Sequence, residues 1–136
     1  ELKRGALLSF SFTGMVYFEG AAHPSSSMRG ITFDSRTGDE ILLEDLFLPG
    51  TDWRDAVNWL VSCEIDRQVE EEGLMVFDDE EYPDVLEYSD QFFLRPGELV
   101  LFWTDTQFTP HASGQPEFAL QIGDLEQYLR PEYSSW

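Results

Sequence analysis

Hydrophobic and polar positions alternate most clearly near the start of the chain. Residues 7–18 have the sequence LLSFSFTGMVYF, in which leucine and phenylalanine alternate with serine and threonine. A period of two is typical of a half-buried strand, so we predict a strand here, with a bulge at Gly14. Residues 20–30 show no period and contain a proline and three serines, which predicts a loop.

The remaining strand predictions form two hairpins and one final strand. Each hairpin turn contains a glycine that can adopt the positive φ that tight turns require. The predicted strands are residues 31–34 and 40–43 around Gly38, residues 91–94 and 98–104 around Pro96 and Gly97, and residues 117–122.

A helical period marks residues 52–72. Asp52 stands where an N-cap belongs, and Gly73 stands where a left-handed C-cap belongs. The apolar stripe needs a surface to cover, so we predict an α+β fold in which one main helix packs on an antiparallel sheet. We predict a single domain over residues 1–136, with a short C-terminal helix from Asp124 to Pro131. The stripe consists of Trp53, Val57, Leu60, Val61, Ile65 and Val69.

The net charge of the chain limits the kinds of molecule that it can bind. The 136 residues include 8 Lys and Arg against 27 Asp and Glu, so the formal net charge is −19. Nucleic acid is excluded as a partner, because binding to phosphates depends on clustered lysine and arginine. No apolar run reaches the ~18 residues of a membrane span.

One segment concentrates the negative charge. Residues 70–90 hold ten carboxylates and no Lys or Arg. Three interpretations stay open: a solvated face, a docking surface for a cationic protein, and a calcium-binding loop. The sequence DDEEYPD lacks the ligand spacing and the glycine of an EF-hand loop.

Metal, cofactor and nucleophile signatures are missing from the sequence. The chain has one cysteine, Cys63, and two histidines, His23 and His111, so no zinc ligand set is present. We predict no metal and no cofactor. The histidines are interpreted as hydrogen-bonding groups that hold two long loops, and Cys63 as a small core or flanking residue.

Two further groups of residues each have competing interpretations. Glu19, Asp105 and Glu117 lie beside aromatic residues and are the best candidates for a carboxylate pair that hydrolyses glycosidic bonds. Four adjacent aromatic residues are expected in the core or in a second packed layer, with an exposed platform for a sugar or a partner as the alternative. These four are Phe92, Phe93, Phe102 and Trp103.

Three segments in this order resemble a family of bacterial cell-envelope domains of unknown biochemical function. They are FEGAAHP over residues 18–24, FDSRTGDEILLEDLF over residues 33–47 and TQFTPHASGQPEFAL over residues 106–120. The family is the C-terminal domain of extracytoplasmic proteins of the PdaC and RsiV types, found beside polysaccharide deacetylase domains and in lysozyme-responsive anti-sigma factors. The resemblance implies an α+β fold outside the cytoplasmic membrane, as the C-terminal part of a larger envelope protein.

The resemblance also implies recognition rather than catalysis. We expect a binding module for a cell-wall component or a cationic protein such as lysozyme, with a polysaccharide-acting hydrolase as the alternative. We further predict that the loops over residues 20–30 and 105–116 lie at the same end of the sheet and form the binding surface. The expected ligand-binding residues are His23, Pro24, Gln107, Pro110, His111 and Gly114.

Overall fold

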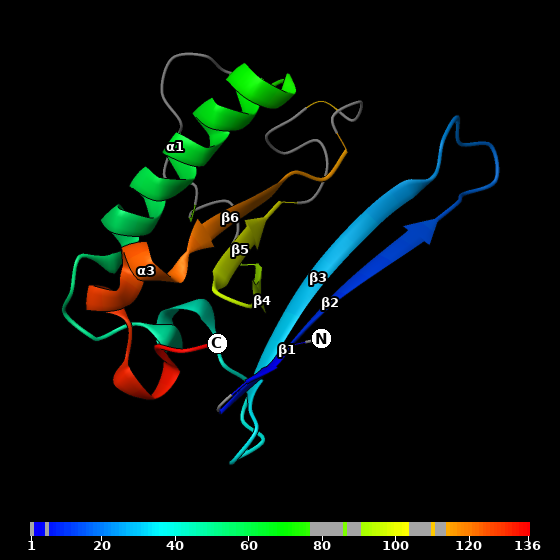
Figure 1. Cartoon of the computed structure of the whole chain (residues 1–136). Coiled ribbons are helices and arrows are strands. Elements are labelled where there is room, and N and C mark those ends of the chain that lie inside the picture. The colour runs from blue at the N-terminus through cyan, green and yellow to red at the C-terminus, as the bar shows by residue number, and fades with distance from the viewer. Residues whose placement is uncertain (1, 5, 77–85, 87–90, 104–109, 111–113) are drawn as a thin grey trace.

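The described residues of the chain form two antiparallel three-stranded sheets and one long helix (Figure 1). The computed structural model describes residues 2–4, 6–76, 86, 91–103, 110 and 114–136. The predicted α+β class is confirmed, and the described strands divide between two sheets. The first sheet holds β1 (Leu2–Arg4), β2 (Leu7–Val16) and β3 (Ser25–Asp34), and the second holds β4 (Phe92–Arg95), β5 (Glu98–Phe102) and β6 (Glu117–Gln121).

The main helix has the bounds that the hydrophobic period predicts. Helix α1 runs over Trp53–Glu72 and ends at Gly73, whose φ of 71° supplies the left-handed cap. Asp52 occupies the N-cap position, but its side chain makes no capping hydrogen bond. None of the described helices combines the length and apolarity that a membrane crossing requires.

Short helical turns connect the strands and close the chain. They are the 3-10 turn η1 (Leu43–Leu46), the helix α3 (Ile122–Leu125) and the 3-10 turns η3 (Glu126–Tyr128) and η4 (Pro131–Tyr133). The predicted helix from Asp124 to Pro131 is therefore corrected to a short helix over Ile122–Leu125, which η3 follows, and Pro131 begins η4. The final residue, Trp136, is buried, and its indole N–H donates to the Glu98 carbonyl at 2.9 Å.

The sheet β4–β5–β6 is buried on both faces. On one face, Val57, Val61 and Ile65 of α1 belong to a large apolar cluster with alternate residues of the three strands, including Leu99 and Phe118. The intervening residues form a second cluster on the other face, because successive strand side chains point to opposite sides. That cluster contains Phe93, Val100 and Phe102, with Met28 and Ala119 packed against it. All four adjacent aromatics are buried, so core packing is confirmed and an exposed platform at those positions is wrong.

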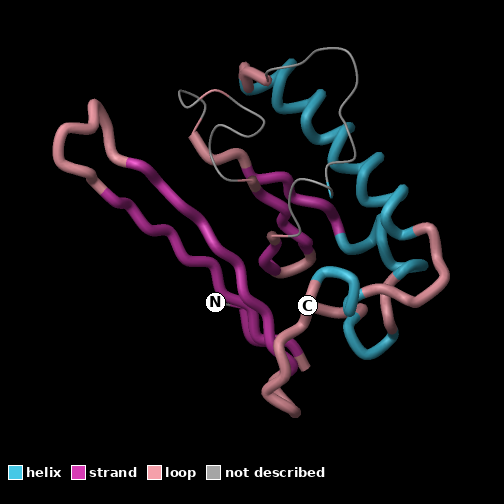
Figure 2. The backbone as a smooth tube through the Cα atoms, turned by 180° about the vertical axis from the view of Figure 1, so that it is seen from behind, coloured by secondary structure: helices cyan, strands magenta, loops and turns pink. Residues whose placement is uncertain are grey.

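Strands β2 and β3 form a long hairpin, here called the arm (residues 7–34). The two strands pair without interruption from Leu7 opposite Asp34 to Val16 opposite Ser25, so the expected bulge at Gly14 is wrong. Residues 25–30 belong to β3, which corrects the predicted loop over residues 20–30. The arm's turn projects away from the rest of the molecule (Figure 1 and Figure 2).

The inward face of β2 is the opposite of what its apolar pattern favours. Leu7 and Ser9 are each 1% exposed, whereas Phe12 is 56% exposed. The Ser9 hydroxyl is hydrogen-bonded to the Thr32 hydroxyl at 2.8 Å and accepts from the Leu94 N–H at 3.0 Å. Burial of Ser9 is tolerated because its hydroxyl is hydrogen-bonded. Both faces of β2 are exposed from residue 11 to residue 16, and Phe12 is among these exposed residues.

Candidate functional site

The turn of the arm holds the first group of predicted site residues. His23 and Pro24 are exposed there, and Nδ1 of His23 lies 3.4 Å from the Pro24 carbonyl oxygen. The Tyr17 hydroxyl donates to the Ala21 carbonyl at 3.0 Å and so ties the two sides of the turn together. The turn therefore has internal hydrogen bonds while its imidazole stays accessible.

The second group of predicted site residues lies largely outside the described residues. Gln107, His111 and the alternative catalytic residue Asp105 are among those not described. Pro110 is half-buried, and Gly114 is exposed with a φ of 72°. The shared surface of the two loops therefore stays a prediction.

The two described carboxylates of the catalytic alternative have different surroundings. Glu19 is exposed in the turn of the arm. Glu117 begins β6, and its carboxylate is ion-paired with Arg95, whose guanidinium also lies 5.1 Å from the ring centre of Phe93. The Glu117 carboxylate is thus engaged in holding β4 to β6.

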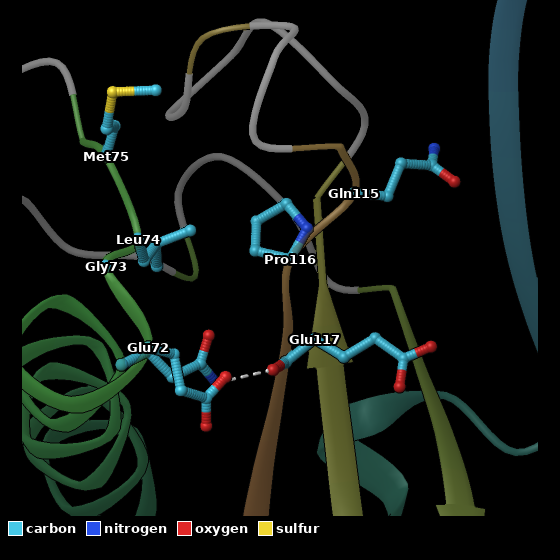
Figure 3. Close-up of a pocket in the computed structure, with 8 residues that line it drawn as sticks. Glu72, Gly73, Leu74, Met75, Gln115, Pro116 and Glu117 are labelled. Atoms are coloured by element: carbon cyan, nitrogen blue, oxygen red, sulfur yellow. Dashed lines mark hydrogen bonds between the residues drawn. The ribbon is translucent and has the colours of Figure 1, made fainter.

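A groove of about 500 Å³ lies where the end of α1 meets the start of β6 (Figure 3). The Gln68 amide group bridges the two elements, donating to the Glu117 carbonyl and to the Glu64 carboxylate, each at 2.9 Å. Sequence reasoning missed this groove, because Gln68 and Glu117 are 49 residues apart. The lining residues are Gln68, Glu72, Gly73, Leu74, Met75, Gln115, Pro116 and Glu117.

Acidic side chains surround the helix end beside this groove. Arg67 donates to Glu64 at 2.6 Å, to Glu71 at 3.1 Å and to Glu72 at 2.9 Å. Its hydrogen bond with Glu64, followed by those with the other two carboxylates, raises the pKa of Arg67 above its usual value. The Arg67 hydrogen bond in turn lowers the pKa of Glu64. One guanidinium thus serves three carboxylates, and a surplus of negative charge remains at the groove's edge.

A second charged cluster lies at the base of the arm. Asp34 is buried and accepts hydrogen bonds from the Arg36 backbone N–H at 2.8 Å and from its guanidinium at 2.6 and 3.0 Å. The Tyr133 hydroxyl donates to the same carboxylate at 3.2 Å. Because all these donors stabilise the carboxylate and tie β3 to the C-terminal segment, the cluster has a structural role.

The structure adds exposed residues that the sequence did not single out. Within the described ranges, no group of three or more His, Cys, Asp and Glu side chains is placed to hold a metal ion. Cys63 is exposed rather than packed in the core. The sequence did contain one signal of an exposed face: β2 alternates over its whole length, but the residues that pair with its outer end, 25–27, are all serines. The large exposed side chains of the arm are Phe12, Met15, Val16, Tyr17 and Phe18.

Comparison with known proteins identifies one family. The profile of a family described as a protein of unknown function, DUF3298, matches residues 44–122. This match excludes the arm and includes α1 and the sheet β4–β5–β6. No sequence among the curated proteins matches the chain.

Two solved structures share the fold. A DUF3298 family protein from Pseudomonas aeruginosa has a TM-score of 0.67 and 17% identity, over 96% of this chain and 59% of that chain. A member of the family from Bacteroides fragilis has a TM-score of 0.72 and 17% identity, over 97% of this chain and 52% of that chain. The chain spans between half and three-fifths of the length of these relatives, and at such identity the likeness shows the fold alone.

Proposed function

Since the chain belongs to the DUF3298 family of proteins of unknown function, we propose a role for it from its charge and geometry. We propose that it is a non-catalytic recognition module that binds a cationic protein. The expected setting is the bacterial envelope, outside the cytoplasmic membrane. That setting rests on the resemblance of the three sequence segments described above to envelope domains. A basic lysozyme is the partner that the same resemblance suggests, and a cell-wall polysaccharide is the competing ligand.

The net charge carries this proposal. If every Lys and Arg offsets one carboxylate, 27 − 8 = 19 negative charges remain. The described arginines of the ion pairs, Arg36, Arg67 and Arg95, are already bound to carboxylates of this chain. A field of this sign accelerates encounters with cationic proteins and disfavours anionic partners.

The groove at the end of α1 is the proposed contact for a basic side chain. Its volume of about 500 Å³ lies within the ~300–1,000 Å³ of ordinary ligand pockets and leaves room for a lysine or arginine side chain. Glu72 lines it, and Glu70 and Glu71 precede Glu72 on the same exposed helix end. Leu74 and Met75 add apolar surface against which the methylene groups of a lysine or arginine can pack.

The geometry supports recognition better than hydrolysis. A glycosidase needs two carboxyl groups on either side of the bond to be cleaved, with one of them free to transfer a proton. Glu117 is instead ion-paired with Arg95, and Glu19 lies in the turn of the arm, on a different element. Neither described candidate therefore supports the hydrolase alternative.

Binding kinetics with a basic lysozyme across a salt series test the proposal. Association should slow as salt rises, because ions shorten the field to ~8 Å near physiological strength. The double variant Glu70→Gln, Glu72→Gln should weaken binding about tenfold, since it removes the Glu72 carboxylate that lines the groove as well as a second charge from the same helix end.

The matched control is Glu126→Gln with Glu132→Gln, which changes the net charge equally at exposed positions outside the groove. It should slow association slightly and leave dissociation unchanged. Equal losses in the two double variants would refute the groove as the contact. If lysozyme does not bind at low salt but purified cell-wall polysaccharide does, the ligand is a polysaccharide and not a cationic protein.

The same assay tests the two loops. His111 and Pro110 are expected to make close contacts, so replacing both by alanine should speed dissociation without changing the rate of association. An unchanged dissociation rate would remove the loops from the binding surface.

A further inference from the structure

The outer side of α1 carries one large aromatic residue that faces solvent. Trp59 is 67% exposed, whereas Trp103 and Trp136 are buried and Trp53 is half-buried. Helix α1 covers one face of the second sheet and the arm crosses the other, so the outer side of α1 faces away from the arm (Figure 1 and Figure 2). Single exposed aromatic residues are common, so the surroundings of Trp59 decide whether it marks a binding site.

Trp59 forms one wall of a pocket between α1 and the helical turns near the C-terminus. The pocket has a volume of about 300 Å³, at the lower end of the ~300–1,000 Å³ of ordinary ligand pockets. Apolar and aromatic side chains supply most of its lining, and one carboxylate and one amide supply the polar groups, which is the usual composition of a binding pocket. The lining residues are Ala56, Trp59, Leu60, Asp124, Gln127 and Tyr128.

Two of these lining groups have no partner within the described part of the chain. The exposed carboxylate of Asp124 takes part in no hydrogen bond or ion pair there, and the indole of Trp59 contacts no other ring and no arginine. Trp53, six residues earlier, differs in both respects. Its ring stacks on Phe47 with the ring centres 4.4 Å apart, and the Arg54 guanidinium lies 5.5 Å from its ring centre. The ring face of Trp59 and the Asp124 carboxylate are thus both available to a ligand.

The charges around Trp59 favour a cationic ligand. Residues three or four apart lie on one face of a helix, and the exposed face of α1 that contains Trp59 has four carboxylates and no lysine or arginine. The two basic residues of α1 are already engaged, Arg54 with the Trp53 ring and Arg67 with three glutamates. A cation over the Trp59 ring therefore gains both from the ring and from the surrounding negative charge. The residues of this face are Asp52, Asp55, Trp59, Cys63, Asp66 and Glu70.

We propose that this pocket binds an arginine side chain of the cationic partner. A guanidinium group is planar, so it can stack on the Trp59 ring while its N–H groups donate to the Asp124 carboxylate. The side-chain carbonyl of Gln127 is a further acceptor at the same edge. A lysine ammonium group is compact and lacks the planar fork, so arginine is preferred. The inference rests on the proposed function for the class of partner, and it adds a contact separate from the groove at the end of α1.

Titration of the 136-residue chain with hexa-arginine and hexa-lysine peptides tests the proposal. The two peptides carry the same number of cationic side chains, so their comparison separates arginine recognition from attraction by net charge. The dissociation constant should be about threefold to tenfold lower for the arginine peptide. Equal dissociation constants for the two peptides would overturn the proposal.

Two alanine substitutions locate the preference for arginine. Trp59→Ala should remove it, because the stacking surface is lost. Phe12→Ala is the matched control, since Phe12 is also a largely exposed aromatic residue, at 56%, and lies on the arm. It should leave the preference unchanged. A preference for arginine that survives Trp59→Ala, or that both variants lose equally, would overturn the assignment to this pocket.

A pair of single-charge variants tests the carboxylate. Asp124→Asn should weaken binding of the arginine peptide about threefold, because it removes the acceptor beside the ring. Asp39→Asn removes the same charge from an exposed turn at the base of the arm and should change binding less than about 1.5-fold. Equal losses in the two variants would reduce the role of Asp124 to general attraction and refute its contact with the guanidinium.

Nuclear magnetic resonance of the indole N–H groups gives a local measurement. The Trp59 signal, identified by its loss in Trp59→Ala, should move when the arginine peptide is added. The Trp136 signal should stay in place, because that indole is buried and donates to the Glu98 carbonyl. A Trp59 signal that does not move at saturating peptide would overturn stacking on this ring.

The arginine pocket and the proposed function fail separately. The peptide titrations contain no lysozyme, so failure of lysozyme to bind would remove that partner and leave the measured preference for arginine standing. The double variant Glu70→Gln, Glu72→Gln should weaken both peptides alike and keep the preference, since neither residue lines the pocket. Lysozyme binding that this double variant weakens and Trp59→Ala leaves unchanged would support the groove and refute the pocket as a contact for the partner.

Discussion

At the scale of single residues, the surroundings of Asp34 stabilise the charged form of its carboxylate. It is buried, and its pKa is held well below the usual range, chiefly by side-chain and backbone hydrogen bonds from Arg36 and further by Tyr133. Burial, followed by the hydrogen bond to Asp34, raises the pKa of the Tyr133 phenol. The cluster joins the end of β3 to the C-terminal turn η4 and thereby fixes the base of the arm.

The pH dependence of stability should report this cluster. Because the pKa of Asp34 is lower in the folded chain than the ~3.9 of an unfolded aspartate, the carboxylate stabilises the fold above about pH 4 and loses that effect as pH falls. Asp34→Asn should lower the free energy of unfolding at neutral pH, and the difference from the unmodified chain should shrink below about pH 4. Urea unfolding at several pH values measures this.

Asp39→Asn is the control, since Asp39 is exposed in the neighbouring turn and accepts none of these side-chain hydrogen bonds. It should show no such pH-dependent difference. A destabilisation by Asp34→Asn that is the same at pH 3 and pH 7 would contradict the assigned role.

At the scale of elements, the crossing of β3 over β4 decides how the arm meets the body. A Cβ atom at Gly30 would lie 1.8 Å from the Phe92 carbonyl oxygen, a separation that no side-chain rotation can relieve. The backbones of the two strands therefore approach closely because residue 30 is glycine. Met28, two residues earlier, then packs against Phe93 and Phe102.

Alanine substitutions at two glycines of the arm distinguish the close contact between β3 and β4 from the general cost of replacing a glycine in a strand. Gly30→Ala should destabilise the fold by about 3 kcal/mol or more, because β3 and β4 must move apart. Gly14→Ala is the matched change, since its Cβ would lie 3.3 Å from the movable Ser27 hydroxyl, and it should cost less than ~1 kcal/mol. Chemical denaturation of the two variants gives the comparison, and equal costs would show that the crossing is not tight in solution.

At the scale of the whole molecule, one apolar core joins the helix, the second sheet and the C-terminus. Residues of η1, α1, β4, β5, β6, α3 and the C-terminus contribute buried side chains to one cluster. The acidic segment over residues 70–90 falls mostly outside the described residues, so calcium binding there is a matter for experiment.

Chelation tests the calcium alternative directly. If the apolar core alone holds the fold together, as the sequence predicts, a strong chelator should leave the melting temperature unchanged. A drop of more than ~4 °C, which corresponds to about 1 kcal/mol for a domain of this size, would mean that an ion is part of the fold. Restoring calcium and then magnesium would distinguish a specific site from general screening of the carboxylates.

The sequence by itself determined the elements whose signals are local. Helix α1 and its end at Gly73 follow from spacing along one helix and from one residue that tolerates a positive φ. The turn between β4 and β5 likewise follows from Pro96 and Gly97, the latter with a φ of 78°. Such features depend on interactions within a few residues, which a single sequence contains.

Only the tertiary structure decided the outer part of β3, the inward face of β2 and the groove. The serines of residues 25–27 have no strand period of their own and become extended because β2 pairs with them. Ser9 turns inward because the Leu94 N–H needs an acceptor, and Gln68 meets Glu117 across 49 residues. Each outcome depends on partners distant in the chain, whose pairing energy exceeds local preference.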